Sequence, residues 1–270
     1  PVAVELEGAL CCVTGGGRGI GRATAIALAA KGASVWIGDI DLDAANAVAA
    51  EIGPRARALR LHVSDSSSFA ECLAAMDRVG PLSVLVNNAG IMRTGPFIEQ
   101  DLEGQHREMA INLGGVVNGM RLALPGMLAR NHGHVVNVSS MAGKMSVPGA
   151  AVYTATKFAV AALSRSVRAE IADRRVTIAT IMPAAVTTDL TAGLDTRGVP
   201  MVSPEDVADA IVRSCRVGNG ETTLPRWLAP IGLVEEALPE RVGSLVKRTV
   251  GAQRRITVDN AERRRYRSRA

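Results

Sequence analysis

The sequence predicts an α/β protein in which helices cover both faces of a doubly wound parallel sheet, giving three layers. Short apolar runs typical of buried strands alternate with longer segments of helical periodicity. The first apolar run leads into a glycine-rich turn, as expected where a strand is followed directly by a helix. Neither a repeat nor a low-complexity linker interrupts this alternation. We therefore expect one domain over residues 1–225 and a C-terminal extension over residues 226–270.

The order of the elements follows from hydrophobic periodicity. The expected strands are residues 9–13, 34–38, 59–63, 82–86, 134–138 and 176–181. The expected helices are residues 20–31, 44–52, 66–79, 101–130 and 152–173. The fourth contains Gly114-Gly115, a pair that is unfavourable inside a helix. Ser203 predicts the start of a further helix, because a capping serine is followed by proline and two acidic residues.

Composition favours a globular protein of the cytoplasm. Hydrophobic residues make up 47% of the chain and aromatic residues 3%, so Ala, Val, Leu and Ile must fill the core. The net charge of +5 is uneven, since residues 241–270 carry a net +8 and the remainder −3. This basic tail lacks a recognised reading element, which argues against nucleic-acid binding. We expect neither a signal peptide nor a membrane-spanning helix.

The cysteines and histidines do not predict a metal site. Cys11 and Cys12 are adjacent in an expected strand, so their side chains should point to opposite faces, and we expect buried, reduced thiols. His132 and His134 form a tempting pair, but the sequence offers no third ligand beside them, which favours a simple loop.

A glycine-rich turn follows the first strand and has the composition of a phosphate-binding turn. Glycines let the backbone approach a pyrophosphate, and the helix that follows offers free N–H groups. Asp39 ends the second strand, where a carboxylate binds the adenosine ribose and repels a 2′-phosphate, which favours NAD over NADP. Arg18 argues the other way, for NADP, but we weight Asp39 more heavily. The turn reads Thr14-Gly15-Gly16-Gly17-Arg18-Gly19-Ile20-Gly21.

Tyr153 and Lys157 are four residues apart in an expected helix and therefore share a face. A free tyrosine has a pKa of about 10, and a neighbouring ammonium favours its phenolate. Lowering this pKa by about 3 units needs roughly 4 kcal/mol. Most pairs with this spacing are surface pairs, so the spacing by itself says little.

Three motifs in order make the chain similar to the compact, single-domain branch of the short-chain dehydrogenases/reductases, over residues 8–225. They are the glycine turn, Asn87-Asn88-Ala89-Gly90 after the fourth strand, and Ser140 thirteen residues before Tyr153 of the Tyr-x-x-x-Lys motif. The resemblance implies a Rossmann fold, an alcohol/carbonyl oxidoreductase that uses NAD, and a homodimer or homotetramer.

The resemblance also implies roles for four catalytic residues. Tyr153 would be the general acid/base, and Lys157 would lower its pKa and hold the nicotinamide ribose. Ser140 would hydrogen-bond the reacting oxygen, whereas Ser139 would be a strand-end hydroxyl satisfied by backbone. Asn112 would anchor a water-mediated proton path, with a buried Asn bonded to the main chain as the alternative.

Further positions match the cofactor site of the family. His62 stands where the family often has Asp, and Ala184 replaces a glycine before Val186, so those contacts depart from the family pattern. The residues implied in cofactor binding are Gly15, Gly17, Arg18, Gly19, Ile20, Gly21, Asp39, Val63, Asp65, Asn88, Ala89, Gly90, Tyr153, Lys157, Pro183, Val186 and Thr188.

Apolar residues gather at the expected mouth of the substrate site, together with a lobe over residues 189–202. They predict a hydrophobic alcohol or ketone such as a steroid, retinoid, terpenoid or lipid-derived compound, because methionines adapt to varied apolar shapes. Ordinary packing is an alternative of nearly equal weight. The predicted pocket residues are Met92, Met141, Met145, Val147 and Leu190.

The extension over residues 226–270 has three interpretations. In order of preference, it packs on a second subunit or on the domain itself, contacts a membrane surface through apolar and basic faces, or covers the substrate entrance. Two rival functions also remain. One is an NADPH-dependent ketoreductase of lipid or polyketide metabolism, and the other, which the intact catalytic residues disfavour, is a non-catalytic dinucleotide-binding scaffold or sensor.

Overall fold

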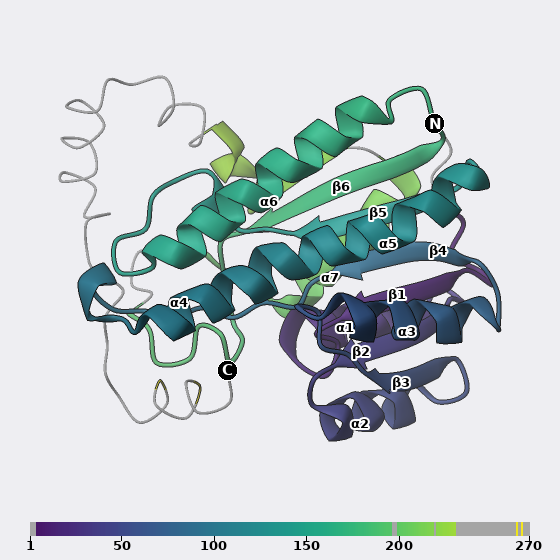
Figure 1. The fold of residues 1–270 in the computed structure, drawn as a ribbon, viewed down its shortest axis with the longest axis horizontal. Coiled ribbons are helices and arrows are strands. Elements are labelled where there is room, and N and C mark those ends of the chain that lie inside the picture. Colours follow the sequence, from purple (N-terminus) through teal and green to yellow (C-terminus); the bar gives the residue numbers. More distant parts are fainter. Residues whose placement is uncertain (1–3, 196–198, 219, 231–262, 264–265, 267–270) are drawn as a thin grey trace.

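The protein is built on a single seven-stranded parallel sheet with the strand order β3-β2-β1-β4-β5-β6-β9 (Figure 1). The computed structural model describes residues 4–195, 199–218, 220–230, 263 and 266. A separate pair of two-residue strands, β7 (Ala185–Val186) and β8 (Met201–Val202), lies beyond the sheet. The sheet strands are β1 (Leu10–Thr14), β2 (Ser34–Asp39), β3 (Ala56–Arg60), β4 (Leu82–Asn87), β5 (Gly133–Val138), β6 (Val176–Pro183) and β9 (Gly220–Leu224).

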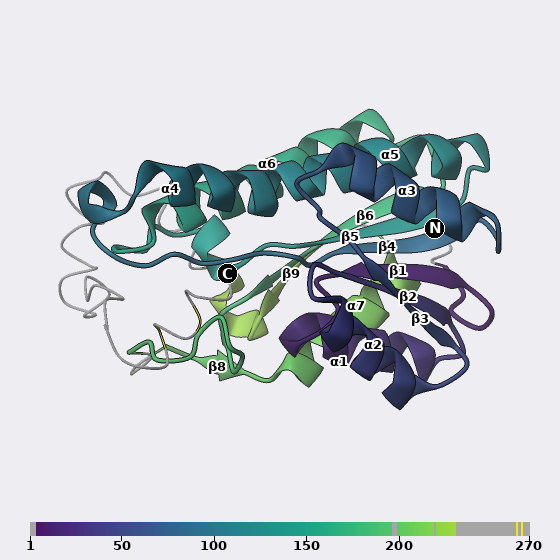
Figure 2. The same cartoon turned by 60° about the horizontal axis from the view of Figure 1, so that its bottom comes forward.

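Helices cover both faces of this sheet, which gives the expected three layers (Figure 2). One face packs against α1 (Gly19–Ala29), α2 (Leu42–Ile52) and α7 (Pro204–Val217), and its core contains Cys11. The other packs against α3 (Ser66–Asp77), α5 (Gly115–Ala129) and α6 (Ala151–Glu170), and its core contains Cys12. The prediction that the two thiols point to opposite faces is therefore confirmed, and all four cysteines are free and buried.

Most predicted elements are present, with shifts at the edges of the sheet. The strand expected at residues 59–63 is β3, which starts and ends three residues earlier because its pairing with β2 stops at Arg60 opposite Asp39. Leu61 and Val63 are buried beyond the end of that pairing, which explains the apolar pattern. Strand β9 was not predicted, because its Gly-Glu-Thr-Thr-Leu sequence is mostly polar.

The long helix expected at residues 101–130 is divided. Helix α4 (Leu102–Met109) passes into a π-helical turn at Ala110–Gly114, and α5 follows directly. Such wide turns are rare inside helices and often lie at functional sites. Gly114 and Gly115 occupy the junction, and a Cβ at Gly115 would lie 2.9 Å from Val63 Cγ2, which explains the second glycine.

Ser203 caps α7 as predicted, and forms a reciprocal capping box with Asp206. Among the described residues, no helix is long and apolar enough to cross a membrane. Of the predicted extension, only residues 226–230, Arg263 and Tyr266 belong to the described part of the chain.

Candidate active site

The glycine-rich turn joins β1 to α1 and packs so closely on its neighbours that side chains at several of its glycines would overlap them. Gly15 and Gly19 have φ values of +62° and +47°, a region that favours glycine. A Cβ at Gly15 would lie 2.8 Å from Ala89 Cα, and one at Gly21 would overlap the Gly15 carbonyl oxygen. Arg18 precedes the helix without a side-chain capping bond. Within the described residues, this cradle fits a dinucleotide pyrophosphate at the N-terminus of α1.

The end of β4 holds this turn in place. Asn88 Nδ2 donates to the Thr14 and Gly15 carbonyl oxygens at 2.9 and 3.0 Å. Thr14 Oγ1 accepts the Asn88 and Ala89 N–H groups at 3.0 and 3.1 Å. Thr14 is the first residue of the turn but was not predicted as a site residue. Its role as the link between β1 and β4 follows from strand order, which spacing along the chain does not reveal.

Asp39 lies against the glycine turn, where the sequence places a ribose-binding acid. Its Oδ2 accepts the Gly17 N–H at 2.9 Å and its Oδ1 accepts the Asp41 N–H at 3.0 Å. Arg18 forms an exposed ion pair with Asp41. The carboxylate of Asp41 therefore lies beside Arg18, the residue that favoured binding of the 2′-phosphate of NADP.

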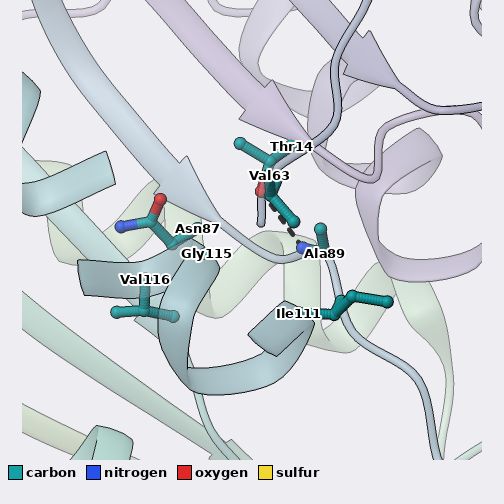
Figure 3. Close-up of a pocket in the computed structure, with 7 residues that line it drawn as sticks. All are labelled: Thr14, Val63, Asn87, Ala89, Ile111, Gly115 and Val116. Carbon is teal, nitrogen blue, oxygen red and sulfur yellow. Dashed lines mark hydrogen bonds between the residues drawn. The ribbon is translucent and has the colours of Figure 1, made fainter. Parts of the chain in front are cut away.

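A shallow recess without room for a water molecule is lined in part by Asn87 and Ala89 (Figure 3). Val63 and Ala89, both predicted near the cofactor, meet there. Asp65, predicted beside them, instead caps α3 by accepting the Ser67 and Ser68 N–H groups at 2.8 and 3.4 Å. The recess is lined by Thr14, Val63, Asn87, Ala89, Ile111, Gly115 and Val116.

Ser140, Tyr153 and Lys157 come together between the end of β5 and the start of α6. Lys157 Nζ lies 5.5 Å from the centre of the Tyr153 ring and donates to the Val138 carbonyl oxygen at 3.0 Å. Ser140 hydrogen-bonds Tyr153 and its Oγ accepts the Ala142 N–H at 3.1 Å. Ser139 Oγ instead donates to the Lys157 carbonyl oxygen at 2.8 Å, as expected for a strand-end hydroxyl.

Asn112 lies in the π-helical turn and bonds the main chain. Its Oδ1 accepts the Ile91 N–H at 2.8 Å, and its Nδ2 donates to the Ile91 carbonyl oxygen at 2.9 Å and to Thr156 Oγ1 at 3.2 Å. A Cβ built on Gly90 would lie 3.2 Å from Asn112 Oδ1 and 3.7 Å from Lys157 Nζ. The buried Asn is thus bonded to the main chain of Ile91 and to Thr156, on the side of Gly90 where Lys157 Nζ also lies.

Burial is the largest cause of the pKa shifts of Tyr153 and Lys157. It raises the pKa of Tyr153 to about 12, although the hydrogen bond from Ser140 opposes this shift. Burial lowers the pKa of Lys157 to about 8, against the attraction of Glu108. That Lys157, together with the positive charge of a nicotinamide, lowers the pKa of Tyr153 stays a prediction, since the largest cause of the shift seen here is burial of the phenol.

Glu108 is a fully buried carboxyl that the sequence analysis missed. Its Oε1 accepts the Arg93 N–H at 2.9 Å, and burial raises its pKa to about 7. Lys157 and Arg263 are among the cations that attract it. The available signal was its position one helical turn before Asn112, which aligns both side chains on one face.

The segment after β6 passes from Ser140 to the glycine turn. Ser140 Oγ lies 3.5 Å from the Pro183 carbonyl oxygen, and the Val186 carbonyl oxygen accepts the Thr188 hydroxyl at 3.4 Å. A Cβ on Gly19 would lie 3.0 Å from Thr188 Cγ2, so Thr188 stands directly over the turn. The predicted residues Pro183, Val186 and Thr188 therefore connect the two halves of the site.

Three of the five predicted pocket residues surround Tyr153. Met92, Val147 and Leu190 form one apolar cluster with Tyr153, together with Ala142, Ala150 and Leu194. Met141 is buried and Met145 partly buried, but neither belongs to this cluster.

His134 serves the core rather than a metal. Its Nδ1 lies 2.7 Å from Thr177 Oγ1 and its Nε2 lies 3.0 Å from Ser214 Oγ. No group of three or more His, Cys, Asp or Glu residues suited to a metal occurs in the described part of the chain. His134 is thus a buried residue of strand β5.

The burial of His134 predicts a loss of stability in acid. Burial lowers its pKa from 6.5 to about 4, so the unfolded state binds more protons between these pH values. The free energy of unfolding should therefore fall from pH 6.5 to pH 4, by up to about 3 kcal/mol from this group. Urea titrations across this range check it. His134→Gln, which cannot titrate, should have a flatter profile, and equal slopes would contradict the prediction.

Comparison with known proteins identifies the family. Residues 9–197 match the family model described as short chain dehydrogenase. The chain belongs to the short-chain dehydrogenase/reductase family. Members of this family bind NAD(P) and act as alcohol/carbonyl oxidoreductases, and this protein is such an enzyme.

Named relatives have different substrates. A 2,5-dichloro-2,5-cyclohexadiene-1,4-diol dehydrogenase of Sphingobium indicum is 36% identical over 197 residues, which are 72% of this chain and 79% of the relative. A sorbitol dehydrogenase of Cereibacter sphaeroides is 38% identical over 225 residues, 81% of this chain and 88% of the relative. A 3-ketoacyl-(acyl-carrier-protein) reductase from Brucella melitensis, solved with NADH, is 29% identical with a TM-score of 0.75, covering 78% and 91% of the two chains.

Proposed function

We propose that this protein is an NAD(H)-dependent dehydrogenase that interconverts a hydrophobic alcohol, secondary or primary, and its ketone or aldehyde. The observation that carries the proposal is the joint placement of Ser140, Tyr153 and Lys157 beside an apolar cluster and the glycine turn. The nicotinamide, when bound, would supply the hydride chemistry at its C4 carbon.

The side chains of this chain would handle the proton. Tyr153 would donate a proton to the ketone oxygen in reduction and take it back from the alcohol hydroxyl in oxidation. Its raised pKa keeps the phenol protonated and ready to donate at neutral pH. Ser140 would hydrogen-bond the same oxygen. Lys157 would hold the nicotinamide ribose and favour the phenolate when the proton leaves.

The preference for NAD rests on Asp39. Its carboxylate accepts the Gly17 N–H, so it is fixed at the turn, where it would bind ribose hydroxyls and repel a 2′-phosphate. A ketoreductase that uses NADPH is the competing function. A structural relative named as a 3-ketoacyl-(acyl-carrier-protein) reductase was solved with NADH, so a ketoreductase reaction does not by itself require NADPH.

Asp39→Asn should shift the cofactor preference toward NADP. The amide keeps an oxygen for the Gly17 N–H but loses the charge, so the ratio of kcat/KM for NADP to that for NAD should rise about tenfold or more. Steady-state kinetics with both cofactors check it. Asp43→Asn, an exposed acid in the first turn of α2, is the matched control. An unchanged ratio in Asp39→Asn would contradict the role of Asp39.

The apolar cluster around Tyr153 supports a hydrophobic substrate. The direct test is a panel of secondary alcohols with NAD, followed at 340 nm, in which apolar alcohols should react faster than sugars of similar size. Faster turnover of sugars, as the sorbitol dehydrogenase relative would suggest, overturns this choice of substrate. No turnover of any alcohol or ketone would favour the non-catalytic scaffold instead.

A homodimer or homotetramer is part of the proposal. Helices α4 and α5 and the segment before them leave large apolar side chains exposed, which is typical of surfaces that pack on a partner. Peripheral membrane contact through the C-terminal extension is the weaker alternative, and most of that extension lies outside the described residues. The exposed apolar residues are Phe97, Ile98, Leu102, Met109 and Val117.

A further inference from the structure

Two residues near the C-terminal end of the sequence lie against the active site. Arg263 is fully buried and its guanidinium donates to three separate acceptors. Its Nη2 donates to the Met92 carbonyl oxygen, its Nη1 to the Leu190 carbonyl oxygen at 2.7 Å, and its Nε to Thr94 Oγ1 at 3.2 Å. One side chain thus joins the segment after β4 to the segment after β7.

Tyr266 adds to the same contact. Its hydroxyl accepts the Met92 N–H at 2.9 Å, and the Arg263 guanidinium lies 4.4 Å from the centre of its ring. The phenols of Tyr266 and Tyr153 are close enough that a charge on the first raises the pKa of the second. Tyr266 therefore lies beside the proposed catalytic tyrosine.

The surroundings are built to hold a buried cation. A guanidinium removed from water is costly unless acceptors and a negative charge surround it. Two carbonyl oxygens and a hydroxyl accept its protons, and the buried Glu108 carboxyl attracts it. Both residues that Arg263 holds by their carbonyl oxygens, Met92 and Leu190, belong to the apolar cluster around Tyr153.

We infer that Arg263 and Tyr266 complete the substrate pocket of their own chain and restrict it to compact, freely diffusing alcohols and ketones. The inference rests on the proposed function. Tyr153 is only 8% exposed, and Arg263 bonds the main chain of two of its apolar neighbours, Met92 and Leu190. A substrate tethered to a carrier protein would need an open approach to Tyr153, which the Arg263 contacts obstruct.

The first test does not depend on activity. Arg263→Ala and Tyr266→Phe should each speed hydrogen exchange at the Met92 amide, since Tyr266 Oη is its acceptor and Arg263 stacks on that ring. Arg213→Ala, an exposed arginine of α7, is the matched control and should exchange as the wild type does. Unchanged exchange in both pocket variants would overturn the inference.

The second test measures substrate size. The ratio of kcat/KM for a bicyclic secondary alcohol to that for cyclohexanol should rise about tenfold in Arg263→Ala, through KM more than kcat, because a hydrophobic pocket discriminates by this order. NADH affinity, followed by fluorescence, should not change. Faster Met92 exchange with an unchanged ratio would overturn the role in specificity. A wild type that oxidises no alcohol contradicts the proposed function instead, while the exchange result still decides whether the contact forms.

Discussion

Tyr153→Phe is expected to lower kcat by about 10³-fold or more, because the positioned proton donor is lost while the ring remains. The phenyl ring keeps its place among Met92, Ala142 and Ala150, so the fold should be retained. Turnover of the best alcohol of the panel, followed at 340 nm, measures the effect.

Cofactor binding separates a chemical defect from a structural one. NADH should bind Tyr153→Phe with a Kd within about threefold of the wild type, since the glycine turn and Asp39 are untouched. Undiminished turnover would remove Tyr153 from the proposed mechanism. A parallel loss of NADH affinity would indicate that the variant disturbs the site rather than the proton transfer.

Gly21→Ala is expected to have the second largest effect. Its new Cβ would overlap the Gly15 carbonyl oxygen and lie 2.7 Å from Asn88 Nδ2, and these are the groups that hold the turn. Neither neighbour can withdraw without breaking the link between β1 and β4. The variant should lose roughly 2 kcal/mol or more of unfolding free energy and bind NADH about 100-fold more weakly.

Gly80→Ala is the matched control for this substitution, because a Cβ there meets no atom of the described chain within 4 Å. Urea titration and fluorescence titration with NADH should give nearly wild-type values for it. Equal NADH affinity in the two variants would show that the turn tolerates a methyl group, and the cradle would then need a different explanation.

The sequence predicts the buried centre of this fold well and its edges poorly. Strands β1, β4 and β5 are mostly apolar and almost entirely buried, since helices cover both of their faces. Strand β9 pairs on one side only, with β6, and its burial is partial. Its polar sequence therefore resembles a loop. The π-helical turn was visible only as an irregular glycine pair, because periodicity over a few residues does not distinguish a wide turn from an α-helical one.

The active site likewise contains residues that the sequence predicts and residues that it does not. Asp39 and the glycines were predictable, because one turn and one strand end place them, and so was the helical pairing of Tyr153 with Lys157. Arg263 and Glu108 were not. Arg263 reaches Met92 across 171 residues, and in the sequence it begins a run of basic residues typical of a solvated tail. The contacts of Arg263 and Tyr266 agree with packing of the extension on the domain itself, part of its first interpretation, and the proposal above places them at the substrate entrance, its third.

The number of residues in the π-helical turn fixes how α4 is rotated relative to α5. Each residue of an α-helix rotates the chain by about 100°, and the wide turn accommodates one residue more than regular winding would. Deleting a single residue from Ala110–Gly114 would rotate α4 by that angle relative to α5. Glu108 would leave the Arg93 N–H, and Gln105 the Phe97 carbonyl oxygen. Surface loops generally tolerate a change of length. The stretch Ala110–Gly114 instead needs a fixed number of residues, even where its side chains vary.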